Sequence, residues 1–220
     1  MFFLIIILSF GASALVRQWM TRTYAKWSKV PNRAGVNGHT VARHILDANG
    51  LSNVKLEVSE GMLTDHYVPS QKLMRLSQEI NNAPSVASIA VAAHECGHAL
   101  QDKEGYGPLK LKAVMMPLAA IGNQFGLMLT LGAAMFGSPT LMNSGLLMML
   151  LGMLMPLLTL PIEFDASKRA LETLTTMKLV DSNEYEGAKS MLRAAALTYV
   201  AGAASSAAIV GLILFRFFKR

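Results

Sequence analysis

The segment SVASIAVAAHECGHALQD, residues 85–102, has the apolar spacing of a helix and contains the pattern HExxH. Pro84 breaks the chain just before it, and Ser85 is a favourable residue for the N-cap of a helix. Gly105 follows the segment and is typical of a helix C-terminus. The pattern therefore predicts one helix that begins at Ser85 and ends before Gly105.

His94 and His98 lie four residues apart in this helix, so both imidazoles project from one face. Two imidazoles at this spacing can hold one Zn²⁺ at about 2.0–2.1 Å each. Glu95 is then placed to take a proton from the zinc-bound water, whose pKa zinc lowers towards about 7. The alternative is a helix that merely carries two histidines and a glutamate on its polar side. We predict a zinc site with Glu95 as general base.

The composition indicates a membrane protein. Only 15% of the 220 residues are charged, against about a quarter in ordinary soluble domains. Residues 113–162 contain no charged side chain at all. As one helix this run would measure about 75 Å, whereas the apolar core of a bilayer is about 30 Å thick. Because Gly137-Ser138-Pro139 interrupts it, we predict a transmembrane hairpin of helices 114–136 and 140–162.

A zinc hydrolase usually has three protein ligands and one open position. A hairpin brings the chain back to the face of the bilayer that it left, so Glu163 returns to the level of the HExxH helix. We therefore predict Glu163 as the third ligand, at the start of a helix that continues to about Leu179. The alternative is a carboxylate favoured there by the helix dipole. His66 is the next candidate for the third ligand.

Residues 1–16 are uncharged and precede Arg17, which predicts an N-terminal transmembrane helix within residues 1–20. A cleaved signal peptide is the alternative, but such peptides have a positive N-terminal region and this one has none. The basic residues that follow place residues 21–112 in the cytoplasm by the positive-inside rule. They are Arg17, Arg22, Lys26, Lys29 and Arg33.

Residues 21–112 are predicted to form a cytoplasmic zincin-like segment with a small β-strand insert. The expected elements are a helix over 40–49, strands over 54–58 and 62–68, and a short helix over 70–80. The second strand contains His66, which either contacts zinc, substrate or a developing oxyanion, or is a structural strand histidine. As an edge strand it could also bind an extended peptide by β-augmentation.

Residues 163–193 are predicted to form cytoplasmic helices, and 194–220, rich in Ala, Gly and Ser, a C-terminal membrane helix. Four spans with an external N-terminus would leave Arg216, Lys219 and Arg220 outside, against the positive-inside rule. Either the last helix does not fully cross, or the first is not a true span. The expected fold is a mainly α membrane protein with about three to four transmembrane helices.

Four further residues complete the candidate set. Asp165 is a candidate partner for one of the zinc-binding imidazoles, since such histidines usually donate their second N–H to a carboxylate or carbonyl. Arg193 and Tyr199 are candidates for stabilising an oxyanion, or else a helix-flank anchor and a packing residue. Cys96 is the single cysteine, which excludes an intramolecular disulfide and fits a reducing compartment.

Three motifs together resemble a known family. Residues 63–69 (LTDHYVP), 91–101 (VAAHECGHALQ) and 161–167 (PIEFDAS) are similar to the YugP-type neutral zinc metallopeptidases of bacteria. More distantly, the chain resembles the HtpX and CAAX-prenyl-endopeptidase group, in which an Asp usually follows the Glu ligand by four residues. Ser167 occupies that position here. The resemblance implies a membrane-bound zinc endopeptidase.

The sequence therefore predicts an endopeptidase that uses a zinc-activated water to hydrolyse membrane or membrane-proximal proteins. The expected location is the bacterial cytoplasmic membrane, with the active site on the cytoplasmic side. The expected partners are a polypeptide substrate and the lipid bilayer. The net charge of +6 has no interleaved basic and aromatic run typical of nucleic-acid binding. The alternative is a catalytically inactive membrane scaffold, and a transporter is a weaker third. The sequence carries no signal for the natural substrate or the oligomeric state.

Overall fold

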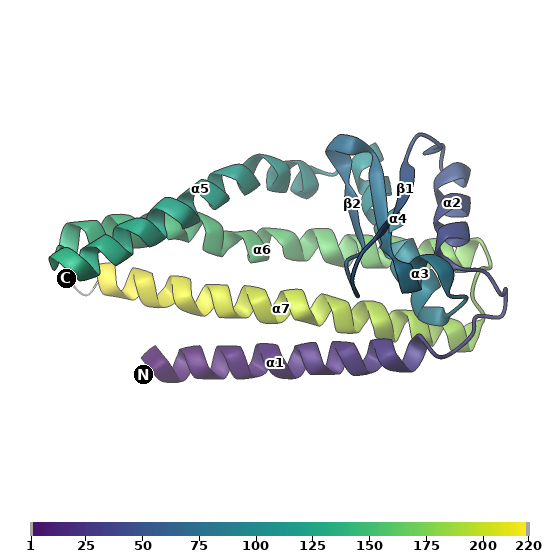
Figure 1. The fold of residues 1–220 in the computed structure, drawn as a ribbon, viewed down its shortest axis with the longest axis horizontal. Coiled ribbons are helices and arrows are strands. Elements are labelled where there is room, and N and C mark those ends of the chain that lie inside the picture. The colour runs from purple at the N-terminus through teal and green to yellow at the C-terminus, as the bar shows by residue number, and fades with distance from the viewer. Residues whose placement is uncertain (1, 219–220) are drawn as a thin grey trace. The chain divides into compact units, whose positions relative to one another are not determined.

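The computed structural model describes residues 2–218, with side chains for 11–211 and for Phe215. Helices dominate this part of the chain, and one small three-stranded sheet accompanies them (Figure 1). The backbone divides into two compact units. The site unit comprises Val16–Tyr106 and Ile162–Thr198, and the hairpin unit comprises Met1–Leu15, Gly107–Pro161 and Tyr199–Arg220. The prediction of a mainly α membrane protein with a small β insert is confirmed.

Helix α4 (Val86–Glu104) is the central helix of the site unit. The Ser85 side chain caps it by accepting from the backbone N–H of Ser88 at 3.1 Å, and Gly105 ends it with a φ of +68°. The predicted helix is therefore confirmed at both ends. Helices α2 (Gly38–Ala48) and α3 (Gln78–Asn82) pack against it. The shared core consists of side chains such as Ile45, Leu46, Met74, Leu76, Ile80 and Ile89, all fully buried.

The sheet contains β1 (Lys55–Ser59), β2 (His66–Val68) and β3 (Leu73–Ser77) in the order β1-β3-β2. Strand β3 pairs in parallel with β1 and antiparallel with β2. The strand predicted over 54–58 is present as β1, whereas only the His66–Val68 part of the strand predicted over 62–68 forms β2, which is an edge strand.

The short helix predicted over 70–80 is wrong, because residues 73–77 form the central strand of the sheet. A single 3-10 turn (Pro69–Gln71) and a left-handed Lys72, with a φ of +47°, reverse the chain between β2 and β3. Strand β3 buries four of its five residues between its two neighbours and the helices. Pairing with β1 on one side and β2 on the other satisfies its backbone, and this gain overrides local helix propensity.

Helices α5 (Gly107–Phe136) and α6 (Pro139–Thr176) form the predicted hairpin, and Gly137 turns the chain with a φ of +63°. The two helices approach closely where Gly126 and Gly145 meet. A Cβ atom added at Gly145 would lie 2.7 Å from the carbonyl oxygen of Gly126. Small residues at such crossings allow close helix packing in lipid.

The expectation that Glu163 begins a new helix is wrong, because α6 continues without interruption from Pro139 to Thr176. Pro156 and Pro161 lie inside it. Proline removes one backbone donor but does not force a helix to end where neighbouring groups compensate. The change from uncharged to charged sequence at Glu163 marks a change of surroundings, and it leaves the backbone helical.

Two more long helices complete the chain. Helix α1 spans Phe2–Trp27, and α7 spans Ser182–Phe218 after the Asp181 side chain has capped its first turn. Within the described residues, α5, α6 and the Ser182–Gly211 part of α7 are long and apolar enough to cross a membrane. Lys219 and Arg220, part of the predicted C-terminal membrane segment, lie outside the described residues.

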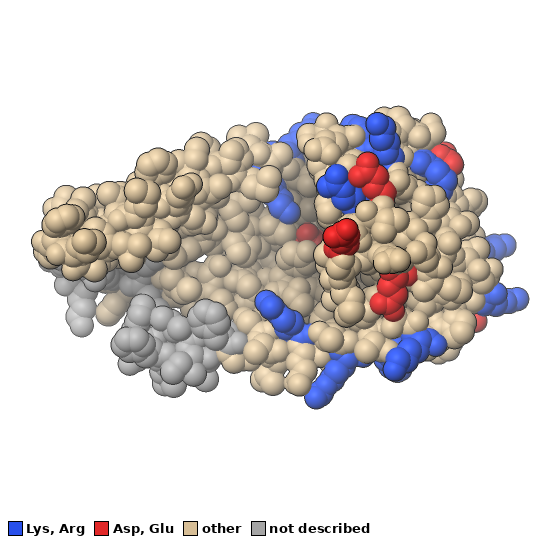
Figure 2. Space-filling view, in the orientation of Figure 1, with Lys and Arg blue, Asp and Glu red and all other residues tan. Residues whose placement is uncertain are grey.

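The two units differ in surface chemistry. Charged side chains are scattered over the surface of the site unit in Figure 2, whereas residues 113–162 contain none. Large apolar side chains along α5 are instead exposed, for example Met128 at 61% and Met135 at 80%. Water-exposed apolar patches of this extent are rare in soluble proteins. A lipid environment explains them.

Candidate metal centre

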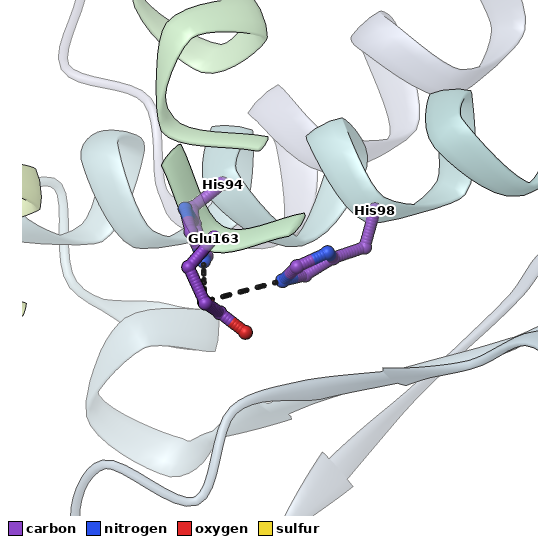
Figure 3. Close-up of side chains that lie close together, drawn as sticks. All are labelled: His94, His98 and Glu163. Atoms are coloured by element: carbon purple, nitrogen blue, oxygen red, sulfur yellow. Dashed lines mark hydrogen bonds and ion pairs between the residues drawn. The ribbon is translucent and has the colours of Figure 1, made fainter. Parts of the chain in front are cut away.

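Three side chains from two helices converge in the site unit (Figure 3). His94 and His98 project from α4, and Glu163 projects from α6. Oε2 of Glu163 lies 3.3 Å from Nε2 of His94 and 3.7 Å from Nε2 of His98. The imidazole rings meet edge to face, with centroids 4.8 Å apart and planes at 82°. The structure thus brings together the three residues predicted as ligands.

This arrangement fits a zinc ion. Donor atoms about 2.1 Å from one ion at tetrahedral angles are roughly 3.4 Å apart. The three candidate donor atoms all lie within 4.8 Å of one another, so small side-chain adjustments suffice to surround an ion. Two imidazole nitrogens and one carboxylate oxygen are a donor set found in catalytic zinc sites, and it leaves a fourth position open.

Glu95 supports the same interpretation. Its side chain is buried, at 6% exposure, and its Oε2 atom has no hydrogen-bond partner. Burial raises the pKa of this carboxyl, although the nearby His98 and His94 lower it in part. An ionised carboxylate buried without a partner is costly. A bound cation and a water molecule beside it would supply the missing charge and hydrogen bond.

His98 experiences two opposing influences. Burial disfavours its charged form, while the hydrogen bond to Glu163 and the charge of Glu95 favour it, and the net effect raises its pKa. The neighbouring carboxylates thus favour the charged form of His98 more than burial disfavours it. A divalent cation would replace the proton of that charged form, because histidine binds metals in its neutral form.

Each imidazole also has a partner at its second nitrogen. Nδ1 of His94 lies 3.3 Å from Oγ of Ser167, and Nδ1 of His98 lies 3.0 Å from Oε1 of Gln101. Asp165, the predicted partner of an imidazole, instead accepts from Nε2 of Gln101 at 2.9 Å and thus reaches His98 through it. Sequence reasoning missed Gln101, although it lies three residues after His98 on the same helix face.

Gly97 brings the two helices into contact at the site. A Cβ atom added there would lie 2.5 Å from the backbone carbonyl oxygen of Ala166 on α6. We expect Gly97→Ala to push the helices apart, to destabilise the protein by about 1–3 kcal/mol as overpacking does, and to weaken zinc binding. Thermal unfolding in detergent and zinc titration measure both effects. Gly132→Ala is the control, because nothing lies within 4 Å of its added Cβ; equal behaviour of the two variants would contradict the prediction.

The three remaining candidates are exposed. His66 is exposed on β2, where its Nδ1 is 2.7 Å from the carbonyl oxygen of Thr64. Its neighbour Tyr67 donates to Asp102 of α4, and alternation along the strand turns His66 to the opposite face. Arg193 and Tyr199 are exposed on α7. The predicted roles of His66, Arg193 and Tyr199 therefore stay predictions.

Comparison with known proteins agrees with the geometry. The model of a family described as "putative neutral zinc metallopeptidase" matches residues 2–217. The "Putative membrane protease YugP" of Bacillus subtilis (strain 168) is 38% identical over 203 residues, which cover 92% of this chain and 90% of that protein. No solved structure matches the chain. The resemblance expected from the three sequence motifs is confirmed. The chain therefore belongs to the family of "putative neutral zinc metallopeptidases", and it is a membrane protein of that family.

Proposed function

We propose that this protein is a zinc-dependent endopeptidase that hydrolyses membrane or membrane-proximal proteins. His94, His98 and Glu163 hold the zinc ion, and Glu95 is the general base. One observation carries the proposal: three donor atoms of the right kind converge beside the buried Glu95 carboxylate, whose Oε2 atom has no hydrogen-bond partner. Family membership supports the same activity and the same metal.

The chemistry divides between the metal and the chain. Zinc, when bound, supplies a Lewis acid that polarises a carbonyl and lowers the pKa of water. Glu95 accepts the proton of the water that attacks the peptide carbonyl and then donates this proton to the leaving amine. The buried Glu95 carboxyl lies close to both His94 and His98, which places it for both steps.

Strand β2 is the expected platform for the substrate. Among the described strands it pairs only with β3, so its other edge is open to an extended peptide. Tyr67 in β2 donates its hydroxyl to Asp102 of α4 at 2.7 Å, and Lys72 forms an ion pair with the same carboxylate. This clamp holds the edge strand beside the helix that bears His94 and His98. A peptide added to β2 would therefore be presented to the site.

The segments 21–112 and 163–193 would lie on the cytoplasmic side of the bacterial membrane, and 113–162 would span it as a hairpin. The basic residues from Arg17 to Arg33 support this orientation. The segments 1–20 and 194–220 would supply the remaining membrane helices.

Metal removal tests the proposed activity. We expect the purified protein to contain one zinc per chain and to cleave an unfolded protein such as casein. Because the three donors hold the ion reversibly, 1,10-phenanthroline should abolish cleavage, and added zinc should restore it. Elemental analysis measures the zinc content, and electrophoresis measures the cleavage of casein. A protein free of zinc after careful preparation would favour the inactive scaffold.

The same assay in sealed membrane vesicles tests the orientation. Inside-out vesicles should cleave casein added to the medium, whereas right-side-out vesicles should cleave it only after detergent opens them. Cleavage by intact right-side-out vesicles alone would reverse the proposed topology and leave the zinc site unaffected.

A further inference from the structure

Gln101 is the most buried polar side chain around the candidate metal centre, with no exposed surface. It lies on α4, three residues after His98. Its amide makes three contacts at short range: Oε1 with Nδ1 of His98 at 3.0 Å, and Nε2 with the carbonyl oxygen of Ile162 at 2.7 Å and with Oδ2 of Asp165 at 2.9 Å. The Gln101 amide therefore contacts residues of both α4 and α6.

These contacts determine which way the amide points. The backbone carbonyl of Ile162 can only accept a hydrogen bond, and so can an ionised Asp165 carboxylate. The NH₂ group of Gln101 must therefore face these two acceptors. Arg169 holds the Asp165 carboxylate in place, since its Nε donates to the same Oδ2 atom at 2.6 Å. The reversed amide would set its oxygen against two other oxygens.

The amide orientation in turn determines the tautomer of His98. With its NH₂ group occupied, Gln101 presents only an oxygen to Nδ1 of His98, so Nδ1 must carry the proton. Nε2 of a neutral His98 then has its lone pair free, and Nε2 is the atom that faces Glu163. Because a metal requires that lone pair, Gln101 prepares His98 to bind through Nε2.

We propose that Gln101 is a positioning residue that sets the tautomer of His98 and also links α4 to α6 next to Glu163. Its bond to Ile162 falls one residue before Glu163, so a single side chain aligns ligands from both helices. This inference rests on the zinc site proposed above. It assigns Gln101 no contact with substrate.

The test is zinc affinity, measured on the full-length protein in detergent by competition with a chromogenic chelator. Gln101→Met keeps the length of the side chain and removes its donors and its acceptor. Loss of a partner that orients a metal-binding imidazole typically costs 10–100-fold in affinity, and we expect an increase of about that size in the Kd for zinc. Ser88→Ala is the matched control, because it removes a buried side-chain hydrogen bond at the other end of α4 and should leave the Kd unchanged.

A second measurement needs no variant of Gln101. In zinc-loaded protein with ¹⁵N-labelled histidines, five in all, His98 should show a proton on Nδ1 and no proton on Nε2. The signal is identified by its absence from a variant without His98. A proton on Nε2, or a Gln101→Met variant with the wild-type Kd, would overturn the inference while leaving the zinc site standing. Wild-type protein without zinc affinity would instead overturn the proposed function.

Discussion

Glu163→Ala is expected to abolish stoichiometric zinc binding and, with it, all proteolysis. Glu163 is the one carboxylate among the three candidate ligands, it is 4% exposed, and it lies within 3.7 Å of both imidazoles. Without Glu163, a divalent ion would keep two neutral imidazoles and no anionic ligand among the three candidates. The loss in affinity should exceed the roughly 100-fold that removal of an outer partner can cost.

Elemental analysis after dialysis, together with a zinc titration, measures this effect. Glu172→Ala is the matched control on the same helix, because its side chain is 63% exposed and forms an ion pair with the exposed Lys168. It should retain one zinc per chain. Zinc retained at wild-type affinity in Glu163→Ala would move the third ligand elsewhere, with His66 the next candidate. Helical content by circular dichroism distinguishes loss of the ligand from loss of the fold.

Glu95→Gln is expected to separate binding from catalysis. The substitution keeps the size of the side chain but removes its ability to accept a proton. General acid–base groups typically contribute 10²–10⁴-fold to a rate, so kcat for casein cleavage should fall by about that factor. Zinc content should stay at one per chain, because Glu95 is not one of the three candidate ligand residues.

Single-turnover cleavage with equal zinc loading in both proteins measures this difference. Glu172→Gln makes the same chemical change on an exposed surface and should be as active as wild type. Undiminished cleavage by Glu95→Gln would assign the base to another residue. Loss of zinc from Glu95→Gln would show that Glu95 supports the metal and would remove it from the proposed proton transfer.

Helix α4 and the α5–α6 hairpin could be predicted because their signals are local. Ser85 and Gly105 bound α4 by capping and by backbone conformation, which depend on a few neighbouring residues. The hairpin follows from the uncharged run and the turn at Gly137, because the bilayer thickness limits each span. The HExxH spacing likewise places two imidazoles on one helix face without any knowledge of the fold.

The failed predictions concern strand pairing and the position of a helix end. Residues 73–77 became a strand because β1 and β2 lie on either side of them, and no local pattern reveals such neighbours. Glu163 lies inside α6 because a helix end depends on backbone hydrogen bonds, whereas the sequence showed only a change in polarity.

By itself, the sequence determined the membrane class, the helix that bears His94 and His98, and the hairpin that returns the chain to Glu163. Only the tertiary structure decided that Ser167 and Gln101 reach the second nitrogens of the two imidazoles, and that Asp165 acts on Gln101. The physical reason is the range of the interactions. Helix periodicity and hydropathy can be read from neighbouring residues in the sequence. Hydrogen bonds between α4 and α6 instead depend on the close approach of the two helices at Gly97.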